Sequence, residues 1–301
     1  MLYLPTAVRL GAQESEDSLA DQIRVDIEAG QVDAAVELAR AAVGRYPKSV
    51  YLQQALGISL FKKGLKEEAR SAYGRAIELA PKMPENYFDL ALLDLAEHRY
   101  LDASKSLEAC LRLDPSNAEA HLLLGRAYHN LNQTMPAIEQ FKKVLAIRPT
   151  LPQAHYHLGF AYQSLGNLVP ALDEYNQEIQ VNPRFPDAYW LAGNIELQHG
   201  NTEAAERLFR EAIRLMPQAY QPHYGLARVY LAGKQFADAE TELTAALRAN
   251  PDAAEAHYAL ARLYQQTGKK DAAKHEFQAC VELHVHERKQ ASGIDGAPPQ
   301  P

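Results

Sequence analysis

The stretch that decides the fold is 118–151, AEAHLLLGRAYHNLNQTMPAIEQFKKVLAIRPTL. Its first half, HLLLGRAYHNL, and its second half, PAIEQFKKVLAI, each carry apolar residues at helical spacing, and a short polar turn separates them. Two antiparallel helices are therefore expected to pack face to face. Gly125 on the first helix and Ala137 on the second would let the backbones approach closely, with Phe141 filling the space around that contact.

The same pattern recurs every 34 residues along the chain. Prolines stand at Pro47, Pro81, Pro115, Pro149, Pro183, Pro217 and Pro251, and alanines at Ala35, Ala69, Ala103, Ala137, Ala171, Ala205, Ala239 and Ala273. Each proline ends a second helix, because it cannot donate the interior hydrogen bond and disfavours helix at the residue before it. Left-handed turn residues are expected between the helices at Gly30, Gly64, Gly166, Gly200 and Gly268, and at Asn132.

These repeats resemble tetratricopeptide repeats in their spacing of leucine, small residue, aromatic residue, alanine, aromatic residue and proline. The resemblance implies an all-α, right-handed superhelical solenoid of eight helix-turn-helix units. The eight repeats are expected at 16–49, 50–83, 84–117, 118–151, 152–185, 186–219, 220–253 and 254–287. A numbered position below is the place of a residue within its own repeat.

The two ends of the chain depart from the pattern. The first repeat has Ile23 where a small residue is expected and Asp26 and Ala39 where aromatic residues are, which is typical of an end cap. Residues 1–15 are expected to be a disordered or capping lead-in. Residues 288–301, RKQASGIDGAPPQP, are polar and rich in glycine and proline, so we expect a disordered tail that leaves the last helix incompletely covered.

Composition and charge narrow the classes of partner. The formal net charge is −7, and no basic run is long enough to neutralise a series of phosphates, so nucleic acid is not expected as a partner. No segment approaches the roughly 20 apolar residues of a membrane span. Pro5 and Arg9 interrupt the mildly apolar opening, so we expect a cytoplasmic protein by default, with export left open if the true N-terminus carries a signal peptide. Cys110 and Cys280 lie five repeats apart, too far to form a disulfide, and are expected to be small buried residues.

Catalytic and metal-binding motifs are missing from the sequence. It has no glycine-rich phosphate loop, no GxSxG turn, no HExxH helix and no cysteine-rich metal spacing, so we predict neither enzyme activity nor a cofactor. Four histidines, at position four of their repeats, could suggest a metal ladder: His121, His155, His223 and His257. Equivalent positions in neighbouring repeats stand about 10 Å apart, whereas zinc needs its ligands within about 2.1 Å of one ion. We therefore expect these histidines to serve in packing.

Glu178 and Glu196 stand where the family has a small residue and an aromatic residue. Two carboxylates near one seam could form an acid and base pair. The favoured interpretation is that each of them reaches solvent or an arginine at the edge of its repeat, because a buried acid needs compensation. The same holds for Asp94.

The best candidate for a binding surface is a column formed by positions five and nine of the first helices, one helical turn apart. From the fourth repeat onward the candidate peptide-binding residues are Arg126, Tyr156, Phe160, Trp190, Asn194, Tyr224, Arg228, Tyr258 and Arg262. In the family this face lines the concave groove, and aromatic and arginine side chains dominate binding hot spots. The alternative for each residue is simple packing on its neighbour.

The clamp with which some family members grip acidic chain ends is not reproduced, because position two lacks the required lysine. The resemblance and the column together favour a non-catalytic scaffold or adaptor that binds a protein or peptide segment. Two alternatives stay open: a subunit that recruits an enzyme into a complex, and a structural oligomer that self-associates through its uncovered C-terminal end.

Overall fold

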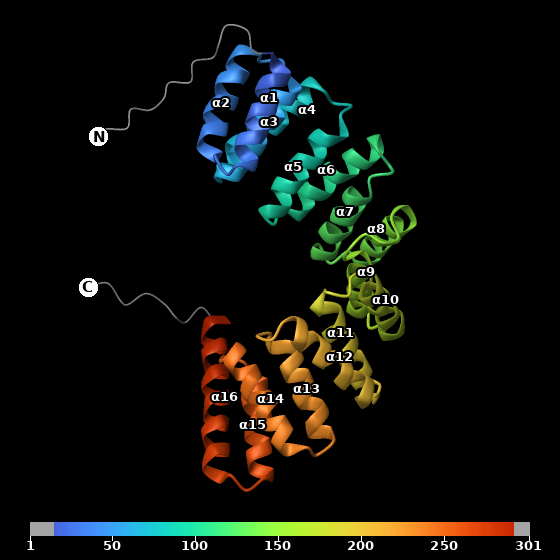
Figure 1. Ribbon diagram of the computed structural model, residues 1–301, viewed down its shortest axis with the longest axis vertical. Helices are drawn as coiled ribbons and strands as arrows, with labels where there is room; N and C mark the ends of the chain where they lie inside the picture. The colour runs from blue at the N-terminus through green and yellow to red at the C-terminus, as the bar shows by residue number, and fades with distance from the viewer. Residues whose placement is uncertain (1–14, 292–301) are drawn as a thin grey trace, which may run out of the picture. The chain divides into compact units, whose positions relative to one another are not determined.

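The computed structural model describes residues 15–291, and the side chains of residues 15–285. Within that range the chain forms sixteen α-helices and no strand (Figure 1). The helices are α1 (Glu16–Glu28), α2 (Val32–Arg45), α3 (Val50–Lys63), α4 (Lys66–Leu79), α5 (Pro84–Ala96), α6 (Tyr100–Leu113), α7 (Ala118–Asn130), α8 (Thr134–Ile147), α9 (Ala154–Ser164), α10 (Leu168–Val181), α11 (Pro186–Gln198), α12 (Thr202–Leu215), α13 (Tyr220–Ala232), α14 (Phe236–Ala249), α15 (Ala254–Gln266) and α16 (Lys270–Ala291).

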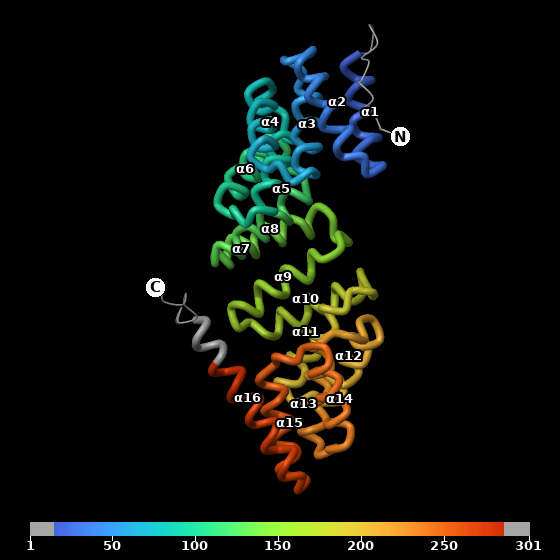
Figure 2. The backbone as a smooth tube through the Cα atoms, turned by 90° about the vertical axis from the view of Figure 1, so that its left-hand side faces the viewer, coloured from blue at the N-terminus to red at the C-terminus, as the bar shows by residue number. Residues whose placement is uncertain are grey.

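The helices pack in the order in which they follow one another along the chain. Each odd-numbered helix is the first helix of a repeat and packs on the even-numbered helix that follows it, and within each half of the chain the second helix of one repeat also contacts the first helix of the next (Figure 2). The protein thus has the helical repeat fold that the sequence predicts. First helices of consecutive repeats also contact each other, α1 with α3 and α3 with α5 in unit 1 and α11 with α13 in unit 2.

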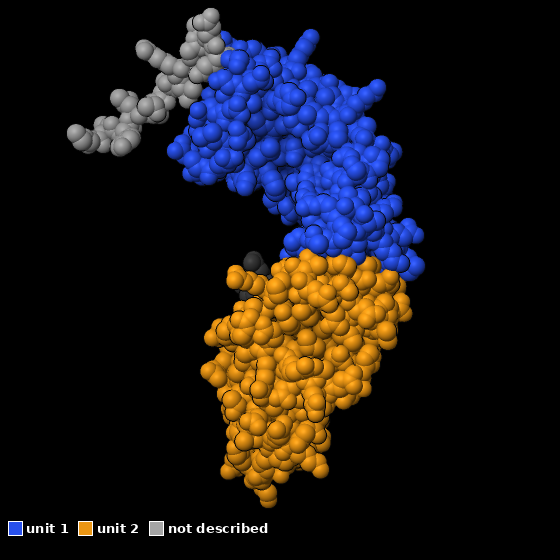
Figure 3. Space-filling view, turned by 45° about the vertical axis from the view of Figure 1, so that its right-hand side comes forward, with its two compact units in different colours: residues 1–154 blue, residues 155–301 orange. Residues whose placement is uncertain are grey.

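The chain divides into two compact units, Met1–Ala154 and His155–Pro301 (Figure 3). We refer to them as unit 1 and unit 2, and describe each by itself. Unit 2 holds helices α10 to α16 and nearly all of α9.

Left-handed residues close the first helix of every repeat. The five glycines and Asn132 predicted for this role all have positive φ, from 59° at Asn132 to 83° at Gly64. In the third and seventh repeats the same position is occupied by His98 and Lys234, both with φ of 57°. The geometry of the turn is therefore kept even where a side chain must adopt a strained conformation.

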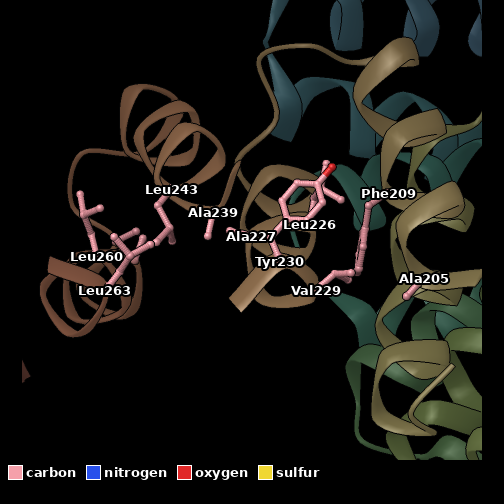
Figure 4. Close-up of a cluster of buried hydrophobic side chains, with 12 residues drawn as sticks. Ala205, Phe209, Leu226, Ala227, Val229, Tyr230, Ala239, Leu243, Leu260 and Leu263 are labelled. Atoms are coloured by element: carbon pink, nitrogen blue, oxygen red, sulfur yellow. The ribbon is translucent and has the colours of Figure 1, made fainter. Parts of the chain in front are cut away.

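Small residues and aromatic rings interlock in the core as predicted. Figure 4 shows a buried cluster of unit 2, in which Phe209 of α12 is fully buried and lies beside Val229 and Tyr230 of α13. A methyl group added to Gly225 would stand 2.4 Å from the Phe209 ring, and one added to Gly125 would stand 2.5 Å from Phe141. Since real contacts are never so short, only glycine fits these positions without repacking.

Both ends of the described part of the chain are helical. In the first repeat Ile23 is fully buried in the core between α1 and α2. At the other end α16 continues to Ala291, so that the first four residues of the predicted tail, 288–291, are helical. The physical reason is that 288–291 consists of good helix formers, and the first glycine comes only at position 293. Residues 1–14 and 292–301, which hold the rest of the predicted lead-in and tail, lie outside the described residues.

Both cysteines are buried thiols and no disulfide joins them, as predicted. Burial, helped by nearby carboxylates, raises the pKa of the Cys110 thiol to about 11. None of the helices in the described part of the chain is long and apolar enough to cross a membrane.

Candidate functional site

Eight of the nine predicted binding residues lie in unit 2, at positions five and nine of its first helices. We call this set the first-helix face: Tyr156, Phe160, Trp190, Asn194, Tyr224, Arg228, Tyr258 and Arg262. The ninth residue, Arg126, lies exposed on α7 in unit 1. Arg126 is therefore not part of the first-helix face, because it belongs to the other compact unit.

Side chains on α11 and α13 meet one repeat apart. Arg228 donates a hydrogen bond from Nη1 to Oδ1 of Asn194, 3.4 Å away. On α11 the Trp190 indole is half-buried and donates from Nε1 to Oδ1 of Asp187 at 2.9 Å. Position nine of one repeat thus lies next to position nine of the following one, and the tryptophan is held in one orientation.

A second set of contacts joins α13 to α15. The rings of Tyr220 and Tyr224 stack with centroids 5.5 Å apart and planes 12° from parallel. The Tyr220 hydroxyl donates to Oε1 of Glu255 at 2.9 Å, and burial, together with that carboxylate, raises the pKa of the phenol. On α15 Tyr258 is 49% exposed. Arg262 is also exposed and donates a hydrogen bond of 3.4 Å to the Tyr258 hydroxyl.

An aromatic cluster forms the α9 end of the first-helix face. Tyr156 stacks on Phe160 at 6.2 Å and meets Phe185 edge to face at 4.9 Å, and Phe160 is 39% exposed. Phe185 is a residue that the sequence analysis missed. It precedes Pro186 at the start of the next repeat, and the aromatic residue just before a helix start was the available signal.

Glu178 corrects the expectation that it reaches solvent. Its side chain is fully buried. One carboxylate oxygen accepts from the backbone N–H of Tyr156 at 3.3 Å and the other from the Asn182 side-chain amide at 3.3 Å. Tyr156 is the third residue of α9, and the first N–H groups of a helix have no partner within it and carry positive partial charge. The carboxylate therefore acts as a cap for α9 supplied by α10.

The other two unusual acids agree better with the expectation. Asp94 is buried but forms an ion pair with Arg70 at 2.5 Å, and Arg70 also pairs with Glu97. Glu196 is partly exposed and accepts from the Asn201 side-chain amide at 2.7 Å. Asp94 and Glu178 thus serve packing between helices, and Glu196 bonds at the edge of its repeat.

The four position-four histidines each bind a partner 19 residues later, on the second helix of their own repeat. His155, His223 and His257 each direct Nδ1 to a glutamate oxygen 2.6 Å away, on Glu174, Glu242 and Glu276, and His121 faces Gln140 at 2.7 Å. On the other side of the ring, Nε2 of His121, His223 and His257 faces the backbone carbonyl of Pro115, Pro217 and Pro251, at 2.9 to 3.1 Å. These three histidines therefore tie their repeats to the preceding ones. No group of three or more histidine, cysteine or acidic side chains suited to a metal occurs in residues 15–285.

The pairing of these histidines with the residue 19 positions later could have been predicted from the sequence, but was not. Tyrosine replaces histidine at position four in two repeats, as Tyr87 and Tyr189, and each donates its hydroxyl to the carbonyl of Pro81 or Pro183. In those two repeats the residue 19 positions later is Ser106 or Leu208, and neither has a carboxylate or an amide in its side chain. The two positions change together along the chain, which is the signal of a contact.

Asp89 on α5 is a further residue that sequence reasoning missed. Burial, with a contribution from the Glu85 carboxylate one turn earlier, raises its pKa to about 6. The available signal was the pair of acids four residues apart on a half-buried helix, because like charges at that spacing repel each other.

Comparison with protein families supports the repeat architecture. Models described as tetratricopeptide repeat match residues 21–84, 106–139, 156–220, 196–252 and 234–286, and a model described as TPR repeat matches 131–166. The chain belongs to the tetratricopeptide-repeat family. Such repeats are typically non-catalytic protein-interaction modules. No curated protein is significantly similar to the chain in sequence.

Solved structures of tetratricopeptide-repeat proteins share the fold. The crystal structure of MamA is 27% identical, with a TM-score of 0.52, and the match covers 53% of this chain and 94% of that one. YrrB, described as a TPR protein with an unusual peptide-binding site, is 20% identical with a TM-score of 0.54 over 66% of this chain and 99% of that one. A tetratricopeptide repeat protein from Parabacteroides merdae is 18% identical, with a TM-score of 0.59 over 83% of this chain and 98% of that one. The last two likenesses concern the fold alone.

Proposed function

We propose that this tetratricopeptide-repeat protein is a non-catalytic scaffold that binds a peptide or protein segment on the first-helix face of unit 2. The observation that carries the proposal is the combination of exposed and fixed side chains on that face. Tyr258 and Phe160 expose large aromatic surface, while Trp190 and Arg228 are held by hydrogen bonds to neighbours. Binding hot spots are enriched in Trp, Tyr and Arg, and side chains ordered in advance lose less entropy on binding.

An affinity capture with the full chain as bait, read by mass spectrometry, tests the proposal. Partners captured by the natural chain should be lost or strongly depleted with a bait that combines Trp190→Ala, Arg228→Ala and Arg262→Ala. A matched bait with Arg210→Ala and Arg214→Ala changes two arginines on α12 instead and should retain the partners. Circular dichroism must be the same for all three baits. Partners retained in full by the triple variant would refute the proposal.

Trp190 gives a direct second readout, because it is the only tryptophan in the chain. A captured partner should shift its emission to the blue as the half-buried indole loses its remaining contact with water. An identical spectrum with and without a saturating partner would place the binding surface elsewhere.

The C-terminal end supports one alternative function, a structural oligomer. Val281 and Val285 on α16 are 61% and 47% exposed and stand one helical turn apart. Sedimentation velocity over a range of concentrations separates the two functions. A concentration-dependent dimer that Val281→Lys abolishes would favour the oligomer.

A further inference from the structure

Arg228 and Arg262 carry the inference, because no carboxylate of the described residues neutralises their charges. Their hydrogen-bond partners are the neutral oxygens of Asn194 and Tyr258, both at 3.4 Å. Within the described residues neither guanidinium has a carboxylate at ion-pair distance. On α12 of the same unit, by contrast, Arg210 pairs with Glu206 and Arg214 with Glu211.

Two acidic side chains near this face accept hydrogen bonds from uncharged donors, Asp187 from the Trp190 indole and Glu255 from the Tyr220 hydroxyl. The face therefore presents its two guanidinium groups beside two carboxylates whose positions are fixed by these bonds, in a chain whose formal net charge is −7. A guanidinium binds a carboxylate through two parallel hydrogen bonds, so the partner that complements this face carries carboxylates.

The repeat sets the spacing between those carboxylates. Arg228 and Arg262 both occupy position nine, and Tyr224 and Tyr258 both occupy position five, so each pair is one repeat apart. Neighbouring packed helices stand about 10 Å apart. A polyproline II segment rises about 3.1 Å per residue and has three residues per turn, so its residues i and i+3 point the same way about 9 Å apart. In a β-strand, residues i and i+3 point to opposite sides.

We infer that the first-helix face of unit 2 binds an acidic polyproline II segment in which carboxylates recur every third residue, one turn of the ligand meeting one repeat. This inference rests on the proposed function and names its partner class. At each repeat the arginine takes a carboxylate, and the tyrosine at position five packs against the proline rings, as aromatic-lined surfaces do with such segments. At Tyr224 the ring is held in place by stacking on Tyr220.

Fluorescence anisotropy with labelled twelve-residue peptides tests the inference on the full chain. The probe has the sequence (Asp-Pro-Pro)4, and its controls are a peptide of the same composition with irregular acid spacing and (Lys-Pro-Pro)4. We expect the regular acidic peptide to bind at least tenfold more tightly than the irregular one, and the lysine peptide not to bind. Equal affinity of the two acidic peptides would overturn the three-residue spacing.

Variants then locate the site. Arg228→Gln with Arg262→Gln should weaken binding of (Asp-Pro-Pro)4 by tenfold or more, and the corresponding double lysine variant should restore part of it, since lysine keeps the charge but not the paired hydrogen bonds. Arg210→Gln with Arg214→Gln should leave affinity unchanged. Binding that survives the Arg228 and Arg262 changes in chains with native circular dichroism would overturn the site. If captured partners depend on the face but (Asp-Pro-Pro)4 does not bind, the scaffold function stands and the partner class is wrong.

Discussion

Glu178 illustrates at the residue scale how a buried carboxylate can accept a hydrogen bond from the first turn of a neighbouring helix. We predict that Glu178→Ala lowers the free energy of unfolding by about 1–3 kcal/mol, because it leaves the Tyr156 N–H without its acceptor and opens a small cavity. Glu178→Gln keeps an oxygen acceptor and should cost less. Urea denaturation measures both, and hydrogen exchange should show the loss at the first turn of α9. An alanine variant as stable as the natural chain would contradict the capping role.

At Asp89 we predict that removing the carboxylate raises the free energy of unfolding, whereas at Glu178 it lowers it. Its pKa in the folded protein is about 6, above the value of about 3.9 in an unfolded chain, so folding favours the protonated form. The stabilisation is therefore present below about pH 4 and is lost as the pH rises through about 6. Asp89→Asn should make the protein more stable at neutral pH by about 1–3 kcal/mol and change little at pH 4. Equal denaturation midpoints for the two chains at pH 7 would show that the carboxylate is solvated.

At the element scale α16 differs from the other second helices, because no following repeat packs on it within the described residues. Helix α14 contacts both α13 and α15, whereas α16 contacts α15 and leaves Val281 and Val285 exposed. We predict faster amide exchange in 277–283 than in the equivalent segment 243–249 of α14, since protection follows buried contacts. Equal protection, in a sample shown to be monomeric by sedimentation, would mean that another part of the chain covers α16.

The helices and their core could be predicted from the sequence because one spacing is repeated eight times. Gly125 beside Phe141 and the left-handed turn at Asn132 both follow from local rules about size and backbone freedom. The partners of polar side chains could not be predicted in the same way. Glu178 lies on α10 and caps α9, and that contact depends on how the helices pack in three dimensions. The packing of Phe185 on Tyr156 has the same cause.

At the scale of the whole molecule, the position-four histidines have different partners in the two compact units. The three histidine–glutamate pairs lie in unit 2, whereas His121 in unit 1 faces the uncharged amide of Gln140. At His223 both ring nitrogens face acceptors, Glu242 and the Pro217 carbonyl, so both hydrogen bonds form only when the ring is protonated. The hydrogen bond to Glu242 is the main cause that raises the pKa of His223, and burial of the ring and, to a smaller extent, Arg248 oppose it.

We predict that the stability of unit 2 depends on pH through His223. Because the pKa of His223 is raised in the folded state, its stabilisation is complete below about pH 6.5 and is lost as the pH rises through the raised value. Hydrogen exchange, corrected for intrinsic rates, should show α13 and α14 opening more readily at pH 8 than at pH 6. Glu242→Gln should flatten this dependence, and Gln140→Glu should introduce one around α7. An unchanged profile in the Glu242 variant would refute the assignment.

The two buried thiols divide between the compact units, with Cys110 on α6 in unit 1 and Cys280 on α16 in unit 2. A thiol reagent attacks the thiolate, and with a pKa of about 11 Cys110 supplies almost none of it at neutral pH while the protein is folded. Labelling then requires the surrounding helices to open. The labelling rate of each cysteine therefore reports the opening of the unit in which it lies. With single Cys→Ala variants used to assign the signals, Cys280 should be labelled first, since one side of its helix already faces water. The natural chain therefore needs no engineered probe for its two halves to be timed separately.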